Sequence, residues 1–483
     1  MAQFTSMDQN QRRKNRPAEM ENHRQKRQRN TIHRRRLPDA SASKNCPQKR
    51  LESNPSQSAQ TQQRLEMVID LFAHRKHQGP SLYGRATICT MKKFIPIFAL
   101  GLFASASCSA FECDPVFGDH MVLQRELPVV ISGSADASQL IEVLWQGRSW
   151  DAKADSHGRW RVTLPAMKTS RTGQDLIVRS GEKKVIMHDV VVGDVWLFSG
   201  QSNMDFPLAK AVGGREELDR FTPIPEIRLL HHQGVSTNDQ SYDAATLQRL
   251  QASKFFAGSW QIVTRDALAS CSAIAWWTII SLHHNEPEVP LALIENAIGG
   301  CGTEAWIPET ILKSDQAYRS LLPDWLDSPR ISPWARSRAL KNLGEHRQAH
   351  HPFQPGFLFS SMQHSLGSIP LRGVVWYQGE TNAEIPDKDG NAKLMMDLIR
   401  GWRELWQQPR LPFFLIELPR IGGTDPLRAN WPMYRQSQAM VAASMSEVHL
   451  IRTTDLGYNS PDVHPPDKKP IAERVSEQIL RLP

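Results

Sequence analysis

The pattern of apolar and polar positions changes along the chain near residue 188. Before this point, from Phe111 to about Met187, short apolar runs alternate with turns rich in Gly, Asp and Ser; the runs are LPVVISGSA, QLIEVLWQG, GRWRVTLPA and DLIVRSG. Closely spaced runs with turn residues between them are typical of antiparallel strands. The pattern predicts a small all-β sandwich domain over residues 111–187. We interpret it as a structural domain rather than a carbohydrate-binding one, because it gathers no catalytic residue types.

After residue 188, apolar segments of strand length alternate with longer segments of helical periodicity. Strands are expected at Val190–Phe198, Glu226–His231, Pro290–Ala297, Gly373–Tyr377, Phe413–Leu418 and His449–Thr453, and helices near Ser272–His284, Leu394–Trp406, Tyr434–Ser444 and Pro470–Leu480. Such alternation indicates an α/β fold, with a mainly parallel sheet covered by helices on both faces. Residues 188–483 are therefore predicted to form an α/β domain. Within it, the polar and proline-rich residues 310–355 are expected to be a loop or a small insertion.

The charge of the chain is unevenly distributed. The formal net charge is +8, but residues 1–90 hold 18 Lys and Arg against 7 Asp and Glu, which leaves 40 against 43 for the rest. Residues 1–90 also have few apolar positions, so this basic tail is predicted to be disordered. A tail of this kind can bind nucleic acid. The near-neutral remainder gives no support for nucleic-acid binding by the protein as a whole.

A second feature changes the interpretation of that tail. The segment MKKFIPIFALGLFASASCSA, residues 91–110, has a basic start, a short apolar stretch and small residues after it, which is the layout of a secretory signal peptide. We therefore interpret Met91 as the true start, and residues 1–90 as not part of the native protein. Cleavage after Ala110 is expected, since Ser105 disfavours lipidation at Cys108. The prediction is a secreted or periplasmic protein with no membrane association apart from export.

The segment GQSNM, Gly200 to Met204, carries the first candidate for chemistry. It directly follows the apolar run VVVGDVWLFS, so Ser202 is expected in a tight turn at the end of a buried strand. Ligands of open α/β sheets bind at this end of the strands. A plain loop serine is the alternative. The segment also lacks the second glycine of the G-x-S-x-G nucleophile elbow, which argues against an ordinary α/β-hydrolase.

Two later strands are followed by segments that could stabilise an oxyanion. IGGCGTEAW places Gly299 and Gly300 after one strand, where glycine lets a backbone N–H approach a ligand. GETNA places Asn382 after another strand, where its side-chain amide could donate to a developing negative charge. The alternatives are an ordinary βα turn for the glycines and a helix N-cap for the asparagine. Glu380 has no role that follows from the residues alone, beyond orienting neighbours or binding substrate hydroxyls.

The last segment, YNSPDVHPPDKKP, contains a carboxylate and an imidazole two residues apart. In an extended segment Asp462 and His464 point the same way, so the carboxylate can bind one ring nitrogen and leave the other free as a base. Pro465 and Pro466 stiffen the segment and delay the next helix. Taken alone, D-V-H is more often a surface loop with one exposed histidine.

Together these segments resemble the SGNH-type hydrolases, and more closely the sialate O-acetylesterase family of carbohydrate esterases. The resemblance covers roughly residues 111–483 and is carried by HMVLQRELPVVISG, GDVWLFSGQSNMDFPL, GGCGTEAW, RGVVWYQGETNA and DVHPPDKKPIAERV. It implies an SGNH-type, flavodoxin-like α/β/α sandwich with a mainly parallel sheet, preceded by a small all-β sandwich domain. Cys301 departs from the family pattern, because Thr usually follows the two glycines.

The resemblance also implies a role for each matching residue. Ser202 would be the nucleophile, His464 the general base and Asp462 the residue that orients it. The backbone N–H groups of Ser202 and Gly300 would form the oxyanion hole with the Asn382 side chain. The candidate substrate-binding residues are Gln201, Glu380 and Trp306.

The predicted function is that of an exported esterase that removes O-acetyl groups from sugars through an acetyl-enzyme. Its substrate would be an acetylated carbohydrate, with sialic acid, acetylated xylan and other glycans all open. No cofactor is expected, and the sequence shows no metal-ligand spacing of the HExxH or CxxC kind. A non-catalytic carbohydrate-binding protein is the alternative, although such a protein would tend to lack the serine or the histidine. A nucleic-acid binder would require that residues 1–90 be translated.

Overall fold

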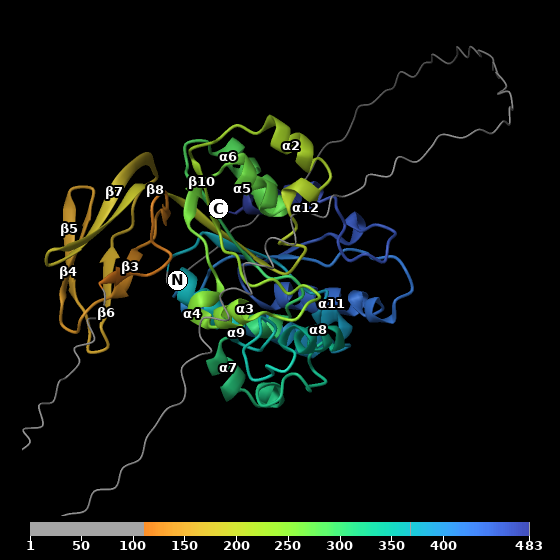
Figure 1. Cartoon of the computed structure of the whole chain (residues 1–483). Helices are drawn as coiled ribbons and strands as arrows, with labels where there is room; N and C mark the ends of the chain where they lie inside the picture. Colours follow the sequence, from red (N-terminus) through yellow and green to blue (C-terminus); the bar gives the residue numbers. More distant parts are fainter. Residues whose placement is uncertain (1–110, 368, 483) are drawn as a thin grey trace, which may run out of the picture. The chain divides into compact units, whose positions relative to one another are not determined.

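The computed structural model describes residues 111–367 and 369–482, which form a mixed α/β fold with a multi-strand sheet (Figure 1). The predicted tail, residues 1–90, and the predicted signal peptide, residues 91–110, lie outside the described residues. In the described part of the chain, no helix is long and apolar enough to cross a membrane. Cys113, Cys271 and Cys301 are all free thiols.

The chain contributes fourteen strands to the described residues. They are β1 Glu112–Cys113, β2 Val122–Gln124, β3 Val129–Ser134, β4 Leu140–Trp145, β5 Arg148–Lys153, β6 Arg159–Leu164, β7 Ser170–Ser180, β8 Lys183–Gly200, β9 Ile227–His231, β10 Trp260–Ile262, β11 Leu291–Ala297, β12 Gly373–Tyr377, β13 Phe413–Ile416 and β14 Val448–Ile451.

The helices follow β8 and lie between the later strands. The α-helices are α2 Gly214–Arg220, α3 Ala244–Arg249, α4 Ala252–Phe255, α5 Arg265–Ser270, α6 Ala273–Asn285, α7 Glu309–Ser314, α8 Pro333–Leu343, α9 Phe357–Leu366, α10 Lys388–Leu405, α11 Trp431–Ser444 and α12 Lys469–Ile479. Short 3-10 helices are η1 Leu208–Lys210, η2 Thr303–Trp306, η3 Gln316–Leu321, η4 Asn382–Glu384, η5 Pro426–Arg428 and η6 Thr454–Leu456.

The four apolar runs that predicted strands before residue 188 do form strands, namely β3, β4, β6 and β7. Strand β6 shows why, because Trp160, Val162 and Leu164 are buried while the residues between them are exposed. This alternation is the pattern of a strand with one face in the core. β1, β3 and β6 form a separate three-stranded sheet, whereas β2, β4, β5 and β7 belong to the eleven-stranded sheet.

Strand β8 connects the early strands to the later ones. Its first half pairs antiparallel with β7, and its second half pairs parallel with both β11 and β12. From Val190 onward every residue of β8 is buried, which matches the continuous apolar run of a strand covered on both faces. The predicted boundary between residues 187 and 188 therefore falls inside one strand. The sheet is mixed rather than mainly parallel, because β8 carries partners of both kinds.

The later strands lie in the order β10-β9-β11-β8-β12-β13-β14. All neighbours from β9 to β14 in this order are parallel, and β10 is an antiparallel edge strand. The predicted flavodoxin-like layout is not confirmed. In that layout the second strand of the parallel sheet lies beside the first, whereas here β11 lies between β8 and β9.

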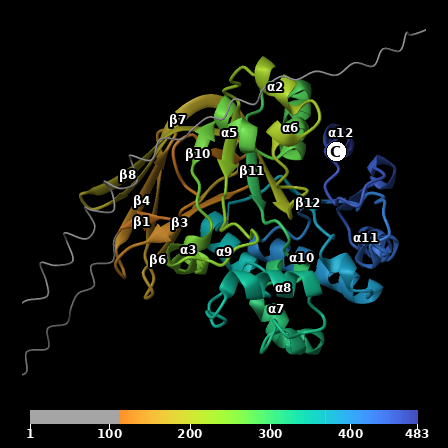
Figure 2. The ribbon, with the colours of Figure 1, turned by 45° about the vertical axis from the view of Figure 1, so that its right-hand side comes forward.

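Helices cover both faces of the parallel part of the sheet. Figures 1 and 2 show α6 and α12 on one side of it, and α9 and α10 on the other. The four predicted helices correspond to α6, α10, α11 and α12. In α12, Ile471, Val475 and Ile479 are buried and four residues apart, so one face of the helix packs on the core.

Residues 310–355 were expected to be a loop or a small insertion, and the loop is wrong, because α7, η3 and α8 lie in this segment. Pro333 is the first residue of α8, where proline is tolerated. The side chain of Ser332 caps this helix by accepting a hydrogen bond from the Ala335 N–H at 3.1 Å. The polar composition of this segment therefore did not indicate the capped helix α8.

Candidate active site

The register of the sheet brings three predicted segments to one edge. Gly200 at the end of β8 is aligned with Ala297 of β11 and with Tyr377 of β12. The next residues of each strand therefore leave the sheet side by side: GQSNM after β8, IGGCG after β11 and QGETN after β12. Because parallel strands end at the same edge, motifs that lie far apart in the sequence meet there.

A tight turn places Ser202 just beyond β8. Gly200 has a φ of 138°, and a Cβ at this position would collide with the Tyr377 carbonyl oxygen, so the turn requires glycine. The backbone N–H of Gln201 donates to that same oxygen at 3.0 Å. The N–H groups of Met204 and Asp205 donate to the Gln201 carbonyl, which closes the turn. Ser202 remains only half-buried at its tip.

The structure brings Ser202, His464 and Asp462 into one hydrogen-bonded row. The Ser202 Oγ lies 2.8 Å from the His464 Nε2, and the His464 Nδ1 lies 3.0 Å from the Asp462 Oδ1. The same carboxylate oxygen accepts the backbone N–H of His464 at 3.0 Å. Partial burial would raise the pKa of Asp462, but these two hydrogen bonds hold it below its ordinary value. The carboxylate is therefore ionised at neutral pH and faces the imidazole.

Two predicted oxyanion donors lie close to the serine. A Cβ on Gly299 would be 3.6 Å from the Ser202 Cβ, so the glycine turn after β11 flanks the serine. Gly300 has a φ of 78°, and a side chain there would collide with Trp334. Within residues 111–367 and 369–482, the backbone N–H groups of Ser202 and Gly300 donate to no protein acceptor. Both remain available to a ligand.

The third predicted oxyanion donor, Asn382, makes its hydrogen bonds inside the protein. Its Oδ1 accepts from the Thr303 N–H at 2.8 Å and from the Gln378 Nε2 at 2.6 Å. Its Nδ2 donates to the Glu304 Oε2 at 2.9 Å. One amide hydrogen is left, but these contacts join Asn382 to the core behind the glycine turn rather than to the serine.

Each of the three predicted substrate-binding residues is almost completely buried. The side chain of Gln201 accepts the Gly379 N–H at 3.3 Å, so it braces two turns against each other. Glu380 is 3 % exposed and accepts a hydrogen bond from Asn203. Trp306 is 0 % exposed and donates to the Cys301 sulfur at 3.1 Å. Their positions support structural roles, and Trp306 cannot stack on a sugar because other aromatic rings surround it.

A buried network lies behind the histidine that no motif in the sequence indicated. Asn203 donates through its Nδ2 to Glu380 and to the Val463 carbonyl oxygen, the latter at 2.8 Å, and its Oδ1 accepts from Lys468. Burial lowers the pKa of Lys468 to about 7 and raises the pKa of Glu380. The network ties the serine turn to the segment that carries His464. Asn203, Glu380 and Lys468 lie within motifs quoted from the sequence, but their contacts depend on the tertiary structure.

An open depression with a volume of about 750 Å³ exposes the row to solvent. Its lining residues come from the serine turn and the Asp462–His464 segment: Ser202, Asp205, Phe206, Pro207, Lys210, Tyr458, Ser460, Asp462, His464 and Pro466. A second cavity of about 470 Å³ shares Asp205 and Pro207 with it and reaches Gly299. A hydroxyl hydrogen-bonded to an imidazole, beside free N–H groups and an open space, can attack a bound ester.

Comparisons with known proteins agree with this chemistry. Residues 345–473 match the sequence model of a family described as "Carbohydrate esterase, sialic acid-specific acetylesterase". The chain is 27% identical over 397 residues to the sialate O-acetylesterase of Rattus norvegicus, covering 74% of this chain and 70% of that protein. It is 26% identical over 414 residues to the sialate O-acetylesterase of Homo sapiens, covering 78% and 72%.

A solved structure extends the comparison to the fold. A carbohydrate acetylesterase from Xanthomonas citri superimposes with a TM-score of 0.59 and 25% sequence identity, covering 76% of this chain and 73% of that one. The family match, the curated relatives and this structure all point to the same class of enzyme. They show that the chain is similar to the sialate O-acetylesterases and to a carbohydrate acetylesterase, as its motifs indicate.

Proposed function

We propose that this protein is an exported serine esterase that removes O-acetyl groups from sugars through an acetyl-enzyme intermediate. The observation that carries the proposal is the hydrogen-bonded row of Ser202, His464 and Asp462 beside an open depression. The order serine, imidazole, carboxylate supplies a nucleophile, its base and the group that orients the base.

In the first half of the reaction, the Ser202 Oγ attacks the carbonyl carbon of the acetyl ester. The serine proton passes to the His464 Nε2, which lies 2.8 Å away. Asp462 holds the hydrogen on Nδ1 and so keeps the ring in the tautomer that can accept this proton. When the tetrahedral intermediate collapses, the imidazolium returns the proton to the sugar oxygen, and the sugar leaves with a free hydroxyl.

In the second half, water attacks the acetyl-serine. His464 takes a proton from the water and returns it to the Ser202 Oγ when the bond between this oxygen and the acetyl carbon breaks, which releases acetate and the free serine. Both intermediates carry a negative oxygen, for which the N–H groups of Ser202 and Gly300 are the donors we propose. The remaining amide hydrogen of Asn382 could reach this oxygen only after a shift of its side chain. We therefore propose that Asn382 contributes less than the two backbone N–H groups.

The substrate we propose is an acetylated sugar, as the names of the sialate O-acetylesterase relatives indicate for those proteins. Phe206 and Tyr458 line the depression and offer aromatic faces to a sugar ring. Acetylated xylan and other glycans are alternative substrates. A non-catalytic carbohydrate-binding protein is the alternative function, and the hydrogen bond between serine and histidine argues against it.

Three finer points belong to the same proposal. We propose that export follows from the signal peptide at residues 91–110, which makes the protein secreted or periplasmic. We propose an SGNH-type site because Ser202, Gly300, Asn382 and the Asp462–His464 pair follow in the chain order of that class. The strands β1 to β7 support a small β-sandwich domain at residues 111–187.

The test is release of acetate from a panel of acetylated sugars by the wild type and by Ser202→Ala. The panel contains O-acetylated sialic acid, acetylated xylan and a small aryl acetate. We expect the wild type to release acetate and Ser202→Ala to lose on the order of 10⁴ to 10⁶ in turnover. An unchanged rate in Ser202→Ala would exclude the mechanism, and wild-type binding of sugars without acetate release would favour the binding protein.

A further inference from the structure

Three potential metal ligands converge beside the serine turn. Asp205 follows Ser202 by three residues, His231 is the last residue of β9, and Glu295 lies on the neighbouring strand β11. One ligand atom from each residue lies within 4.8 Å of the other two. Nitrogen and oxygen ligands bind zinc at about 2.0–2.2 Å, so two ligands of one tetrahedral ion lie about 3.3–3.6 Å apart. The His231 Nε2 and the Glu295 Oε2, 3.8 Å apart, are already close to this spacing.

The buried carboxylate in this group has an unused oxygen. Glu295 is 1% exposed, and its Oε2 accepts the backbone N–H of Ser272 at 3.0 Å and lies 3.8 Å from the His231 Nε2. Its Oε1 is excluded from solvent and makes no hydrogen bond of ordinary geometry, and the neighbouring side chains that could donate to this carboxyl group are the Cys271 thiol and a protonated Asp205. A buried polar atom without a partner is rare in folded proteins and calls for an explanation. A cation between the three side chains would supply the missing partner.

Little positive charge surrounds the two carboxyl groups. Their titratable neighbours are the Cys271 thiol beside Glu295, Lys210 near Asp205, and His232 next to His231. Among them only Lys210 brings a positive charge, so a cation would balance the carboxylates.

We propose that Asp205, His231 and Glu295 bind one divalent transition-metal cation of the zinc class. One imidazole nitrogen and two carboxylate oxygens are zinc ligands, and three protein ligands leave a fourth position for water. Imidazole argues against Ca²⁺ and Mg²⁺, which take oxygen ligands. The inference stands apart from the proposed esterase mechanism, in which the metal has no step.

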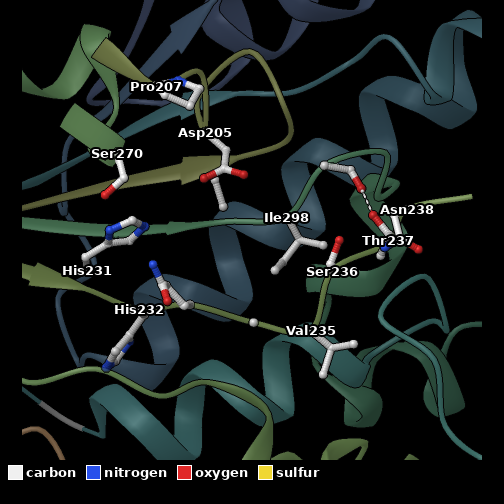
Figure 3. Close-up of a pocket in the computed structure, with 14 residues that line it drawn as sticks. Asp205, Pro207, His231, His232, Val235, Ser236, Thr237, Asn238, Ser270 and Ile298 are labelled. Atoms are coloured by element: carbon white, nitrogen blue, oxygen red, sulfur yellow. Dashed lines mark hydrogen bonds between the residues drawn. The ribbon is translucent and has the colours of Figure 1, made fainter. Parts of the chain in front are cut away.

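A cavity borders two of the three proposed ligands. The cavity of about 470 Å³ is lined by Asp205 and His231, and both side chains project into it in Figure 3. The ion would join the serine turn to β9 and β11, which otherwise meet it through side chains that repel one another when ionised. Because the three ligands come from separate segments of the chain, motif spacing in the sequence could not reveal them.

The experiment measures zinc binding to the purified protein directly. Protein stripped with a chelator is titrated with Zn²⁺ by calorimetry, and the bound metal is then counted by mass spectrometry. We expect about one Zn²⁺ per chain and release of protons on binding, because metal ligands bind in their deprotonated forms. His231→Gln and Glu295→Gln should each weaken binding at least tenfold, whereas His232→Gln, a neighbour in the same cavity, should bind as the wild type does.

The results that would overturn the proposal are distinct from failure of the esterase. Absence of Zn²⁺ binding by the stripped wild type would overturn it, and so would equal affinity in His231→Gln. If Glu295→Gln does not fold, His231→Gln still decides the question, because the His231 side chain is 14% exposed and tolerates a polar replacement better. Ser202→Ala should bind zinc normally, since it removes only the nucleophile.

Discussion

The two sides of His464 differ in almost every physical property. On one side, Asp462 stands in solvent with 58% of its side chain exposed, and its pKa is below the ordinary value. On the other side, Asn203, Glu380 and Lys468 form a network with little or no exposure. There the pKa of the carboxyl is raised and the pKa of the ammonium is lowered, both by burial. The exposed carboxylate of Asp462 is stabilised in its charged form, whereas burial disfavours the charged forms of Glu380 and Lys468.

This difference separates two ways of supporting His464, the base that we propose. Asp462 lies two residues from His464, so it needs no tertiary structure to reach the ring, and it acts through its charge. The buried network holds the backbone of the same segment through Asn203 and the Val463 carbonyl oxygen, and it acts by position. Substitutions on the exposed side should therefore reduce turnover with little loss of stability. Substitutions on the buried side should reduce stability with little loss of turnover.

The largest expected effect on the exposed side comes from Asp462→Asn. The change keeps the shape but removes the charge that supports the imidazolium and permits the wrong tautomer, which cost about 10⁴ in turnover in a well-studied triad. The free energy of unfolding should change by less than about 1 kcal/mol, because the pair is solvent-exposed. Turnover on a small aryl acetate and urea denaturation measure the two effects. A loss of stability comparable to that of a buried substitution would contradict the distinction.

Asn203→Ala is the matching change on the buried side. It leaves Glu380 and Lys468 without their shared partner and frees the Val463 carbonyl oxygen. Each unsatisfied buried group costs about 1–3 kcal/mol, so the free energy of unfolding should fall by at least that amount. Urea denaturation measures it, with Asp462→Asn as the control. An unchanged midpoint would show that the network carries no stability.

The buried ammonium predicts a pH dependence of stability. The pKa of Lys468 is about 7 in the folded protein and 10.5 as its ordinary value, so between these pH values the unfolded chain binds more protons. Stability should then rise with pH by up to about 1.4 kcal/mol per unit from pH 7 to 10, and this contribution should be flat below pH 7. Lys468→Met should lose the rise. Equal slopes for both proteins in denaturation at several pH values would contradict the assignment.

The smallest expected effect on turnover comes from Glu380→Gln. Burial already favours the neutral form of this carboxyl, and glutamine can still accept the hydrogen bond from Asn203. We expect a loss far below that of Asp462→Asn when both are measured on the same aryl acetate. If Glu380→Gln loses more activity than Asp462→Asn, the two carboxylates have been assigned the wrong way round.

The sequence predicted the elements that depend on local pattern. The strands after residue 188, except β10, and four of the helices were found because their apolar positions repeat at strand or helix spacing. The strand order and the mixed sheet were not predicted. Both depend on which strands pair with β8, and a run such as VVVGDVWLFS does not show that its two halves have different partners.

In the candidate site, too, the residues marked by local motifs were predicted and the contacts set by the tertiary structure were not. Ser202, Asp462 and His464 were predicted because motifs mark them, and the structure brings the three side chains together. Trp306 was assigned to substrate binding because it lies in a motif, but the sequence could not show that other aromatic rings enclose it. The contact between Asn203 and Lys468 spans more than 200 residues of chain, so no local sequence pattern could predict it.

The central claim is that Ser202 is an activated nucleophile, and covalent labelling tests it most directly. The protein is treated with an organophosphonate that reacts with activated serines, and the modified peptide is identified by mass spectrometry. The account predicts one adduct on Ser202, much slower labelling in His464→Ala, and none in Ser202→Ala. An adduct on another serine, or full labelling of Ser202→Ala, would contradict it.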